Sequence, residues 1–363
     1  MLALGQLRRR AMLIARLMET WVRRPTTPNR LVLDVTRRCN LRCAMCRTWE
    51  APSRHELTPA ELEELMHQLP NLVWLDVTGG EIFLRTDADQ VLTTIAETAR
   101  ALQVLHFPTN GWFTRRIVET TKRLSERTSA DIIITVSLDG PPEIHDTMRG
   151  RAGSFKRALA TFMELRALDG VDVYVGTTIT PQNADHIDAL GERLKAQVPQ
   201  FRSREWHWNW LQISGHFFHN ATLASETSVR PQQMVREHLR RRGMPHGLVD
   251  MMELLFLVNL EFYQRGEASE IVCQALRSTA FISPEGDLYP CHVYDRPLGN
   301  IRGRNFAEVW QSRSVLDARA DIKRLACGGC FTPCEAYPAL AGAPRQTVAA
   351  TARRALKLVM APK

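Results

Sequence analysis

The stretch CNLRCAMC, residues 39–46, places Cys39, Cys43 and Cys46 in the spacing C-x3-C-x2-C. Common tetrahedral metal sites take four protein ligands, and cubane iron–sulfur clusters usually take four thiolates. Three thiolates so close together therefore predict a metal site whose fourth ligand is either a distant cysteine or a group that the protein does not supply. The spacing alone leaves a zinc site, or cysteines that only fill space, as alternatives.

The composition is that of a folded, soluble protein. The 363 residues suffice for one large core and a smaller module, with 44% hydrophobic and 24% charged residues. Eight cysteines occur in a long chain in which no stretch resembles a secretory signal. This combination favours a cytoplasmic protein that uses its thiols for metal or redox chemistry rather than for disulfides.

The net charge of +8 is concentrated at the two ends of the chain. Residues 1–30 carry seven Arg and one Glu, and residues 342–363 carry five Lys or Arg and no acid. The body between them is mildly acidic, whereas a nucleic-acid binder usually displays positive charge on its folded domain. The charge distribution therefore argues against a nucleic-acid partner.

Both basic ends are expected to form amphipathic helices. The apolar stripes are Leu4, Leu7, Ala11, Ile14, Met18 and Trp21 in the first, and Val348, Ala352, Leu356 and Val359 in the second. No segment approaches the roughly 18 uninterrupted apolar residues of a spanning helix. Two interpretations stay open: the stripes pack on the body, or the helices attach to an anionic membrane surface, here the inner face of the membrane.

Apolar β-rich runs alternate with helical patterns between residues 31 and 213. Strands are predicted at 31–36, 73–78, 104–108, 132–138, 171–179 and about 205–213, and helices at 58–69, 87–101, 114–126, 155–168 and 184–196. Strict alternation predicts a parallel sheet with right-handed crossovers. Six such units are too few for an eightfold barrel, so an open, partial (β/α)6 barrel is expected.

The unusual residues follow consecutive strands. CNLRCAMC follows the first, Gly79-Gly80-Glu81 the second and Thr109-Asn110-Gly111 the third, while Ser137-Leu138-Asp139-Gly140 ends the fourth. Barrel-type sheets build their active sites at the C-terminal ends of parallel strands. Because such residues follow or end four consecutive strands, the sequence predicts that they form one shared site.

At this point the sequence resembles the radical S-adenosylmethionine (SAM) superfamily, whose hallmark is C-x3-C-x-Φ-C after the first strand, with Met45 at Φ. The resemblance implies a [4Fe–4S] cluster on Cys39, Cys43 and Cys46, with SAM as the missing ligand. It also implies SAM contacts from Met45, Gly79, Gly80, Glu81, Asn110, Ser137, Asp139, Arg149 and Thr178. Two glycines let a backbone come close, and a carboxylate suits the ammonium of SAM.

The other five cysteines lie within 269–341, where the alternation of strand and helix stops. FISPEGDLYPC at 281–291 and LGNIRGRNFAEVW at 298–310 resemble the SPASM/twitch modules that follow many radical SAM barrels. Five thiols suffice for one auxiliary [4Fe–4S] cluster but not for two. The expected ligands are Cys273, Cys291, Cys327 and Cys330, with Cys334 a spare or a substitute; a structural zinc is the alternative.

We therefore expect an α/β chain of five parts. They are a basic N-terminal helix (1–29), the partial barrel (30–230), a helical bridge (231–268), the small cysteine-rich auxiliary-cluster domain (269–341) and a basic C-terminal helix (342–363). The resemblance implies reductive cleavage of SAM to a 5′-deoxyadenosyl radical, which abstracts a hydrogen atom from the substrate. It also implies an external electron donor of the flavodoxin or ferredoxin type.

The substrate is less well defined, and no catalytic acid or base can be identified. A small molecule, sugar or lipid-linked substrate is the first expectation, because residues 1–29 are too few for a peptide-recognition domain. Alternatives are a ribosomal peptide presented by a separate partner and a non-enzymatic iron–sulfur electron carrier or scaffold. Asn209, Gln212 and His216 are candidates for the substrate pocket; the first two have opposite parity, so an unbroken strand points only one of them inward.

Overall fold

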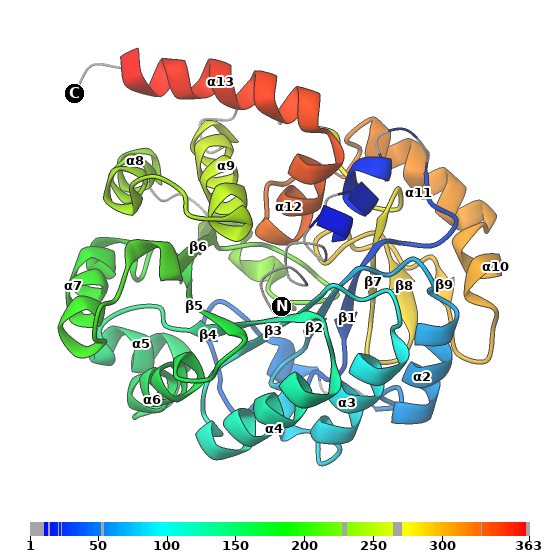
Figure 1. Ribbon diagram of the computed structural model, residues 1–363, viewed down its shortest axis with the longest axis horizontal. Helices are drawn as coiled ribbons and strands as arrows, with labels where there is room; N and C mark the ends of the chain where they lie inside the picture. Colours follow the sequence, from blue (N-terminus) through cyan, green and yellow to red (C-terminus); the bar gives the residue numbers. More distant parts are fainter. Residues whose placement is uncertain are drawn as a thin grey trace.

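The computed structural model describes residues 11–13, 15–20, 22, 24–51, 54–226, 231–263, 271–327 and 329–360. Within them, one nine-stranded sheet runs in the order β6-β5-β4-β3-β2-β1-β7-β8-β9 (Figure 1). The first six strands pair in parallel, which confirms the predicted partial barrel. They are β1 (Arg30–Asp34), β2 (Trp74–Thr78), β3 (Val104–Thr109), β4 (Asp131–Ser137), β5 (Val171–Ile179) and β6 (Trp206–Trp210).

Helices cover the outer face of these strands (Figure 1). They are α2 (Pro59–His67), α3 (Ala88–Thr98), α4 (Thr114–Arg127), α5 (Pro142–Arg149), α6 (Ser154–Arg166) and α7 (Ile187–Gln197). Alternate strand residues such as Leu75 and Leu105 are fully buried in the core cluster that the helices share. Helix α5 was not predicted; it lies between β4 and α6 and ends at Arg149.

The cysteine-rich region continues the barrel sheet instead of forming a detached domain. Strand β7 (Thr279–Ile282) pairs in parallel with β1, and β8 (Asp287–Tyr289) and β9 (Gly299–Asn300) follow antiparallel. Helices α10 (Phe306–Trp310), α11 (Arg313–Lys323) and α12 (Pro333–Gly342) complete the region. The auxiliary cysteines are thereby fixed to the first strand of the barrel.

Within the predicted bridge lie α8 (Pro231–Arg242) and α9 (Leu248–Tyr263), while residues 264–268 lie outside the described residues. The ring of His238 on α8 stacks on Trp208 with centroids 3.9 Å apart. Nη1 of Arg242 donates to the carbonyl of Trp206 at 3.1 Å. The helices therefore close the outer edge of β6, which would otherwise expose unpaired backbone groups.

The described residues of both basic ends include helix, but the packed face is not the predicted one. Residues Leu13, Leu17 and Thr20 are buried, and the two leucines pack against Val73 and Val104 at the starts of β2 and β3. Of the predicted N-terminal stripe, Ala11 and Met18 are exposed, and Leu4, Leu7, Ile14 and Trp21 lie outside the described residues. The expectation that this stripe packs on the barrel is therefore wrong for its described members.

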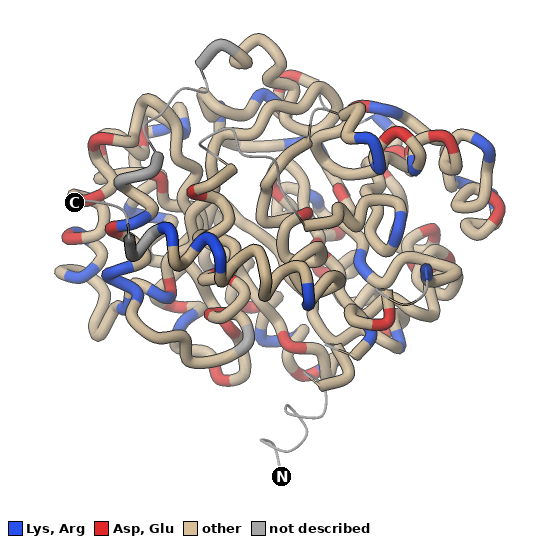
Figure 2. Tube along the Cα trace, turned by 90° about the horizontal axis from the view of Figure 1, so that it is seen from above, with Lys and Arg blue, Asp and Glu red and all other residues tan. Residues whose placement is uncertain are grey.

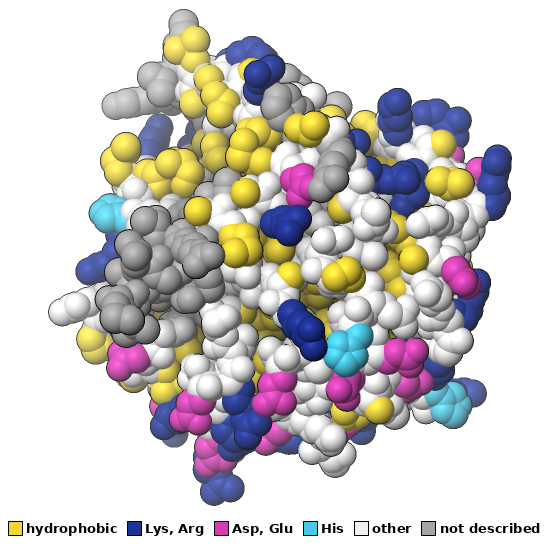
Figure 3. Space-filling model, turned by 45° about the vertical axis from the view of Figure 1, so that its right-hand side comes forward, with side chains coloured by type: hydrophobic (Ala, Val, Ile, Leu, Met, Phe, Trp, Pro, Cys, Tyr) yellow, Lys and Arg dark blue, Asp and Glu magenta, His cyan; other side chains and the backbone are white. Residues whose placement is uncertain are grey.

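Helix α13 (Pro344–Met360) behaves in the same way. It packs through Thr347, Ala350 and Arg354, while Val348 and Leu356 of the predicted stripe are 67% and 61% exposed. Ala352 is also exposed, and the side chain of Val359 lies outside the described residues. Figure 2 shows basic residues along this helix, and Figure 3 shows hydrophobic side chains gathered on the upper part of the molecule. In the described part of the chain, no helix is long and apolar enough to span a membrane.

Candidate active site

The three-cysteine loop is held in place by the end of α5. The amide of Arg42 donates to the carbonyl of Arg149 at 3.1 Å, and the amide of Ala44 donates to that of Met148 at 2.8 Å. Gly150 follows with φ +65°, and a Cβ at this position would lie 2.6 Å from the Arg42 carbonyl oxygen. Glycine is therefore required for the loop to pack this closely against the helix.

The surroundings of the cysteines are apolar. Leu41, Met45 and Met148 are buried in one cluster with Cys43, and Cys39 and Cys46 pack against it. Burial raises the pKa of Cys39 to about 12 and that of Cys43 to about 11. Thiols in such a setting stay protonated until a metal replaces the proton, as iron–sulfur ligands do.

The hydrogen-bond donors around the sulfurs suit a thiolate-bound cluster. The Thr48 hydroxyl lies 3.2 Å from the sulfur of Cys46, and Nη1 of Arg149 lies 3.8 Å from the sulfur of Cys43. No group of three His, Cys, Asp or Glu side chains among the described residues converges on a single ion. Three thiols with hydrogen-bond donors beside two of them suit a [4Fe–4S] group, whose protein ligands each bind a separate iron.

The Gly79-Gly80-Glu81 segment lies directly on the cysteine loop. The amide of Gly80 donates to the carbonyl of Thr36 at 2.6 Å, and the amide of Glu81 donates to that of Arg38 at 2.8 Å. A Cβ on Gly79 or Gly80 would come within 2.4 Å of those same carbonyl oxygens. The two glycines were expected to let the backbone come close to SAM. In the structure they let it come close to the backbone of residues 36–38.

Glu81 is buried and is held by the third strand. Its carboxylate accepts hydrogen bonds from the Thr109 hydroxyl at 3.0 Å and from the Asn110 amide at 2.8 Å. Burial nevertheless raises its pKa to about 7. The side chain of Asn110 in turn donates to Asn40 at 2.9 Å and lies 4.0 Å from the sulfur of Cys39. Predicted SAM contacts from two strands are therefore joined to the cysteine loop.

Asp139 organises the other side of the site. Its carboxylate is fully buried and accepts from Nε of Arg149 at 2.6 Å and from the amide of Thr178 at 2.9 Å. Ser137, two residues earlier, lies opposite Gly176 at the end of β4. The structure thus brings the predicted residues of β4, α5 and β5 together beside the cysteine loop.

The three candidates for the substrate pocket separate in space. Asn209 pairs with Thr178 in the β5–β6 register, so it belongs to the same end of the sheet as the SAM-site residues. The side chain of Gln212 donates to the carbonyl of Trp210 at 3.1 Å, beyond the strand. His216 is buried at the auxiliary region, stacked on Tyr289 at 4.2 Å and bonded to the Cys291 carbonyl at 3.0 Å. Asn209 is therefore the strongest of the three.

A polar network that the sequence analysis missed crosses the strands. Nδ1 of His106 lies 2.7 Å from Asp76, and Nε2 lies 3.0 Å from the Thr135 hydroxyl. Asp76 is also paired with Nη2 of Arg30 at 2.5 Å. A barrel interior is usually filled by branched apolar side chains. The sequence did contain a signal for this network. Asp76 precedes Thr78 by two residues and Thr135 precedes Ser137 by two, and strand residues two apart share a face, so both side chains face the same way as the site residues.

The five auxiliary cysteines are charged neighbours of one another. Burial raises the pKa of Cys273 and Cys291 well above the usual range. Both thiols have Glu335 and Cys330 as charged neighbours, and Cys273 also has Cys327. Cys334 instead has Arg30, Asp76 and Glu335 as its charged neighbours, and its carbonyl accepts a hydrogen bond from Arg30. Cys330 has both Cys327 and Cys334 among its charged neighbours, so the choice of Cys334 as the spare thiol stays a prediction.

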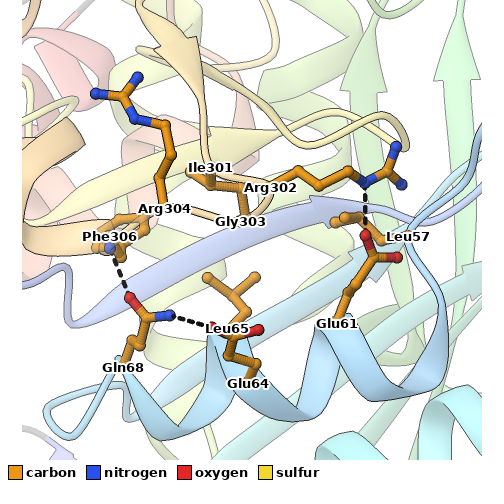
Figure 4. Close-up of a pocket in the computed structure, with 10 residues that line it drawn as sticks. All are labelled: Leu57, Glu61, Glu64, Leu65, Gln68, Ile301, Arg302, Gly303, Arg304 and Phe306. Carbon is orange, nitrogen blue, oxygen red and sulfur yellow. Dashed lines mark hydrogen bonds and ion pairs between the residues drawn. The ribbon is translucent and has the colours of Figure 1, made fainter.

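A shallow pocket lies away from all eight cysteines, where α2 meets residues 301–306 (Figure 4). Nε of Arg302 binds Glu61 at 2.6 Å, and the amide of Phe306 donates to Gln68 at 2.6 Å. These contacts join the barrel to the auxiliary region. The pocket is a seam between the two and not a candidate active site.

Comparisons with known proteins agree with this geometry. The family model described as the radical SAM superfamily matches residues 33–194, and the one described as an iron–sulfur cluster-binding domain, SPASM, matches residues 273–331. The second match contains Cys273, Cys291, Cys327 and Cys330 and stops before Cys334. The two matches lie in the order that the motifs predict.

Several curated relatives match most of the chain. The subtilosin biosynthesis protein AlbA of Bacillus subtilis is 25% identical, over 84% of this chain and 67% of its own length. The AdoMet-dependent heme synthase of Methanosarcina barkeri is 26% identical, over 89% and 93%. The mycofactocin maturase MftC of Mycolicibacterium smegmatis is 25% identical, over 87% and 79%.

Solved structures share the fold. Streptococcus suis SuiB bound to the precursor peptide SuiA has a TM-score of 0.60 at 15% identity, covering 86% of this chain and 75% of SuiB. AdoMet-bound anSMEcpe has a TM-score of 0.56 at 16% identity, covering 92% and 100%. The two family models together show a radical SAM domain at residues 33–194 followed by a SPASM iron–sulfur domain at residues 273–331, so the chain is a radical SAM enzyme that uses SAM and [4Fe–4S] clusters.

Proposed function

We propose that this enzyme modifies a ribosomally made peptide, which a separate partner presents to the barrel. The observation that carries the proposal is that relatives along most of the chain are named as a bacteriocin biosynthesis protein and as maturases. A structural neighbour was also solved with its precursor peptide. The first expectation from sequence, a small molecule, sugar or lipid-linked substrate, has less support.

The residues of this chain would divide the work as follows. Cys39, Cys43 and Cys46 would hold the cluster, which with bound SAM supplies a 5′-deoxyadenosyl radical after one-electron reduction. Glu81 would face the ammonium group of SAM and Arg149 its carboxylate, because each carries the complementary charge. The apolar cluster around Met45 would keep water away from the reactive centre.

The substrate would lie beside the inner end of β6. Asn209 lies opposite Thr178, and its side-chain oxygen is buried without a hydrogen-bond partner among the described residues. A buried amide oxygen without a partner costs free energy, so a donor from the substrate, such as a peptide N–H, would be favoured there. Asn209 would therefore orient the peptide next to the SAM-binding residues.

The test uses precursor peptides encoded beside the gene. Reconstituted enzyme, SAM, a reductant, the presenting partner and each peptide are incubated without oxygen, with a haem precursor in a parallel incubation, and the peptide mass and 5′-deoxyadenosine are measured together. We expect a mass change with a matching yield of 5′-deoxyadenosine, and neither with Cys43→Ala. No mass change in any peptide, with consumption of a haem precursor instead, would favour the activity named for the M. barkeri relative.

A further inference from the structure

A cationic and aromatic surface covers the cysteine loop. We name it the Trp112 patch and define it as Trp112, Arg151 and Arg157. The guanidinium carbon of Arg151 lies 3.6 Å from the centroid of the Trp112 ring, and that of Arg157 lies 4.6 Å from it. Arg151 also donates to the carbonyl of Asn40 within the loop at 3.2 Å. The patch is therefore built directly onto the cysteine-bearing segment.

Positive charge in this patch is not neutralised locally. In the neighbouring segments, Arg37, Arg38 and Arg149 are paired with Glu285, Glu56 and Asp139. Arg151 and Arg157 are exposed, and neither forms an ion pair with a carboxylate in the described residues. The carboxylate of Asp146 on α5 is occupied by the amides of Gly153 and Phe155 and the hydroxyl of Ser154.

The patch also leads to the cluster ligands. Trp112 packs against the apolar cluster that contains Cys43, and Cys39 and Cys46 pack against the same cluster. Cys43 is only 8% exposed, so Trp112 lies in the apolar shell that separates this sulfur from solvent. Tryptophan and arginine are the residue types enriched at the energetic centres of protein interfaces. A partner with a negative surface would be attracted here and held close to the cysteines.

We propose that the Trp112 patch is the docking surface for a small acidic electron-carrier protein. The carrier loses one electron and the three-cysteine cluster gains it, with no bond formed between the proteins. The proposal rests on the reducible cluster and not on the peptide substrate. Its test contains no peptide, so either proposal can fail without the other.

The experiment compares two reductants on the reconstituted holoenzyme with SAM. One is a reduced flavodoxin, a small acidic flavin protein, and the other is photoreduced deazariboflavin, which is small and neutral. Stopped-flow absorbance follows cluster reduction for wild type, Arg151→Glu/Arg157→Glu and the control Arg313→Glu. Arg313 lies on α11 with its side chain 87% exposed. Binding of oxidised flavodoxin is titrated in parallel, and iron content must match wild type in every variant.

At low salt we expect the double variant to accept electrons from flavodoxin at least about tenfold more slowly and to bind it more weakly, because electrostatic attraction speeds association. The difference should shrink at high salt, where charges are screened. Reduction by deazariboflavin should be unchanged, and Arg313→Glu should resemble wild type. Wild-type flavodoxin rates in the double variant at low salt would overturn the proposal. If Arg313→Glu slowed electron transfer from flavodoxin as much as the double variant does, the proposal would also be overturned, because the effect would then come from net charge alone.

Discussion

Asp139 and Arg149 form a buried ion pair that joins the two halves of the active site. The Nε–Oδ2 distance is 2.6 Å, and the carboxylate also accepts the amide of Thr178 at 2.9 Å. At its other end the guanidinium lies 3.8 Å from the sulfur of Cys43. One arginine therefore connects β4 and β5 with the cysteine loop, so its loss should be felt in SAM binding.

The first prediction concerns Arg149→Ala. Iron content should stay near that of wild type, because no cysteine is removed. SAM affinity should fall roughly ten- to hundredfold, since a lost charge-assisted contact costs about 1.5–3 kcal/mol. Equilibrium binding of SAM to reconstituted protein measures this. Arg149→Lys keeps the charge but not the planar fork and should give an intermediate loss. Unchanged affinity in Arg149→Ala would show that the carboxylate of SAM binds elsewhere.

The second prediction assigns the auxiliary thiols by iron content. Wild type should hold about eight irons, as two clusters of four. The triple variant Cys39→Ala/Cys43→Ala/Cys46→Ala should hold about four, and so should Cys291→Ala. Cys334→Ala is the matched control and should keep about eight, because that thiol lies beside Arg30. Loss of four irons in Cys334→Ala would instead make it a ligand.

The third prediction is a pH dependence of stability. Burial raises the pKa of Glu81 from 4.5 to about 7, so the folded state binds its proton more tightly than the unfolded state does. This group therefore stabilises the fold fully below about pH 4.5, and the contribution is lost as pH rises through about 7. The loss is on the order of 3 kcal/mol.

Denaturant unfolding of the metal-free protein between pH 5 and 8 measures this contribution. Glu81→Gln should remove the Glu81 contribution from the pH dependence, while Glu335, whose pKa burial also raises to about 7, keeps its own. Glu97→Gln, at a carboxylate that is 46% exposed, should leave it unchanged. The same pH dependence in Glu81→Gln as in wild type would contradict a raised pKa of Glu81.

The fourth prediction concerns the exposed stripe of α13. We propose that this helix and the basic N-terminal segment attach to an anionic membrane surface, where each basic residue contributes about 1 kcal/mol. Cosedimentation with anionic vesicles should occur at low salt and disappear at high salt. Val348→Ser/Leu356→Ser should weaken it, whereas Leu316→Ser, at an exposed leucine of α11, should not. Wild-type protein that stays in the supernatant at low salt would rule out this role.

The strands and the main site residues could be predicted because each rests on local pattern. β5 begins and ends as predicted, at Val171 and Ile179, since the run is long and apolar on alternate residues. The main site residues lie at the C-terminal ends of strands or in the loops that follow, as Met45, Glu81 and Asp139 do. Their order along the chain was therefore enough to predict one shared site.

Other features depend on contacts between distant segments. The pairing of β1 with β7 joins residues about 250 positions apart, and no periodicity records it. On the packed face of α13, the buried Arg354 donates a hydrogen bond to the side chain of Asn259 on α9 at 2.7 Å. A stripe that looks apolar in sequence was therefore left exposed, while an arginine was buried.

The most direct test of the account is the fate of SAM. Anaerobically reconstituted and reduced protein should convert SAM to 5′-deoxyadenosine and methionine, detected by chromatography with mass spectrometry. Cys43→Ala should produce neither, although its auxiliary cluster and fold persist. The account predicts that 5′-deoxyadenosine forms only in those proteins that hold iron at the three-cysteine loop. Zinc without iron in that loop, or intact SAM after reduction of a protein that holds about eight irons, would contradict it.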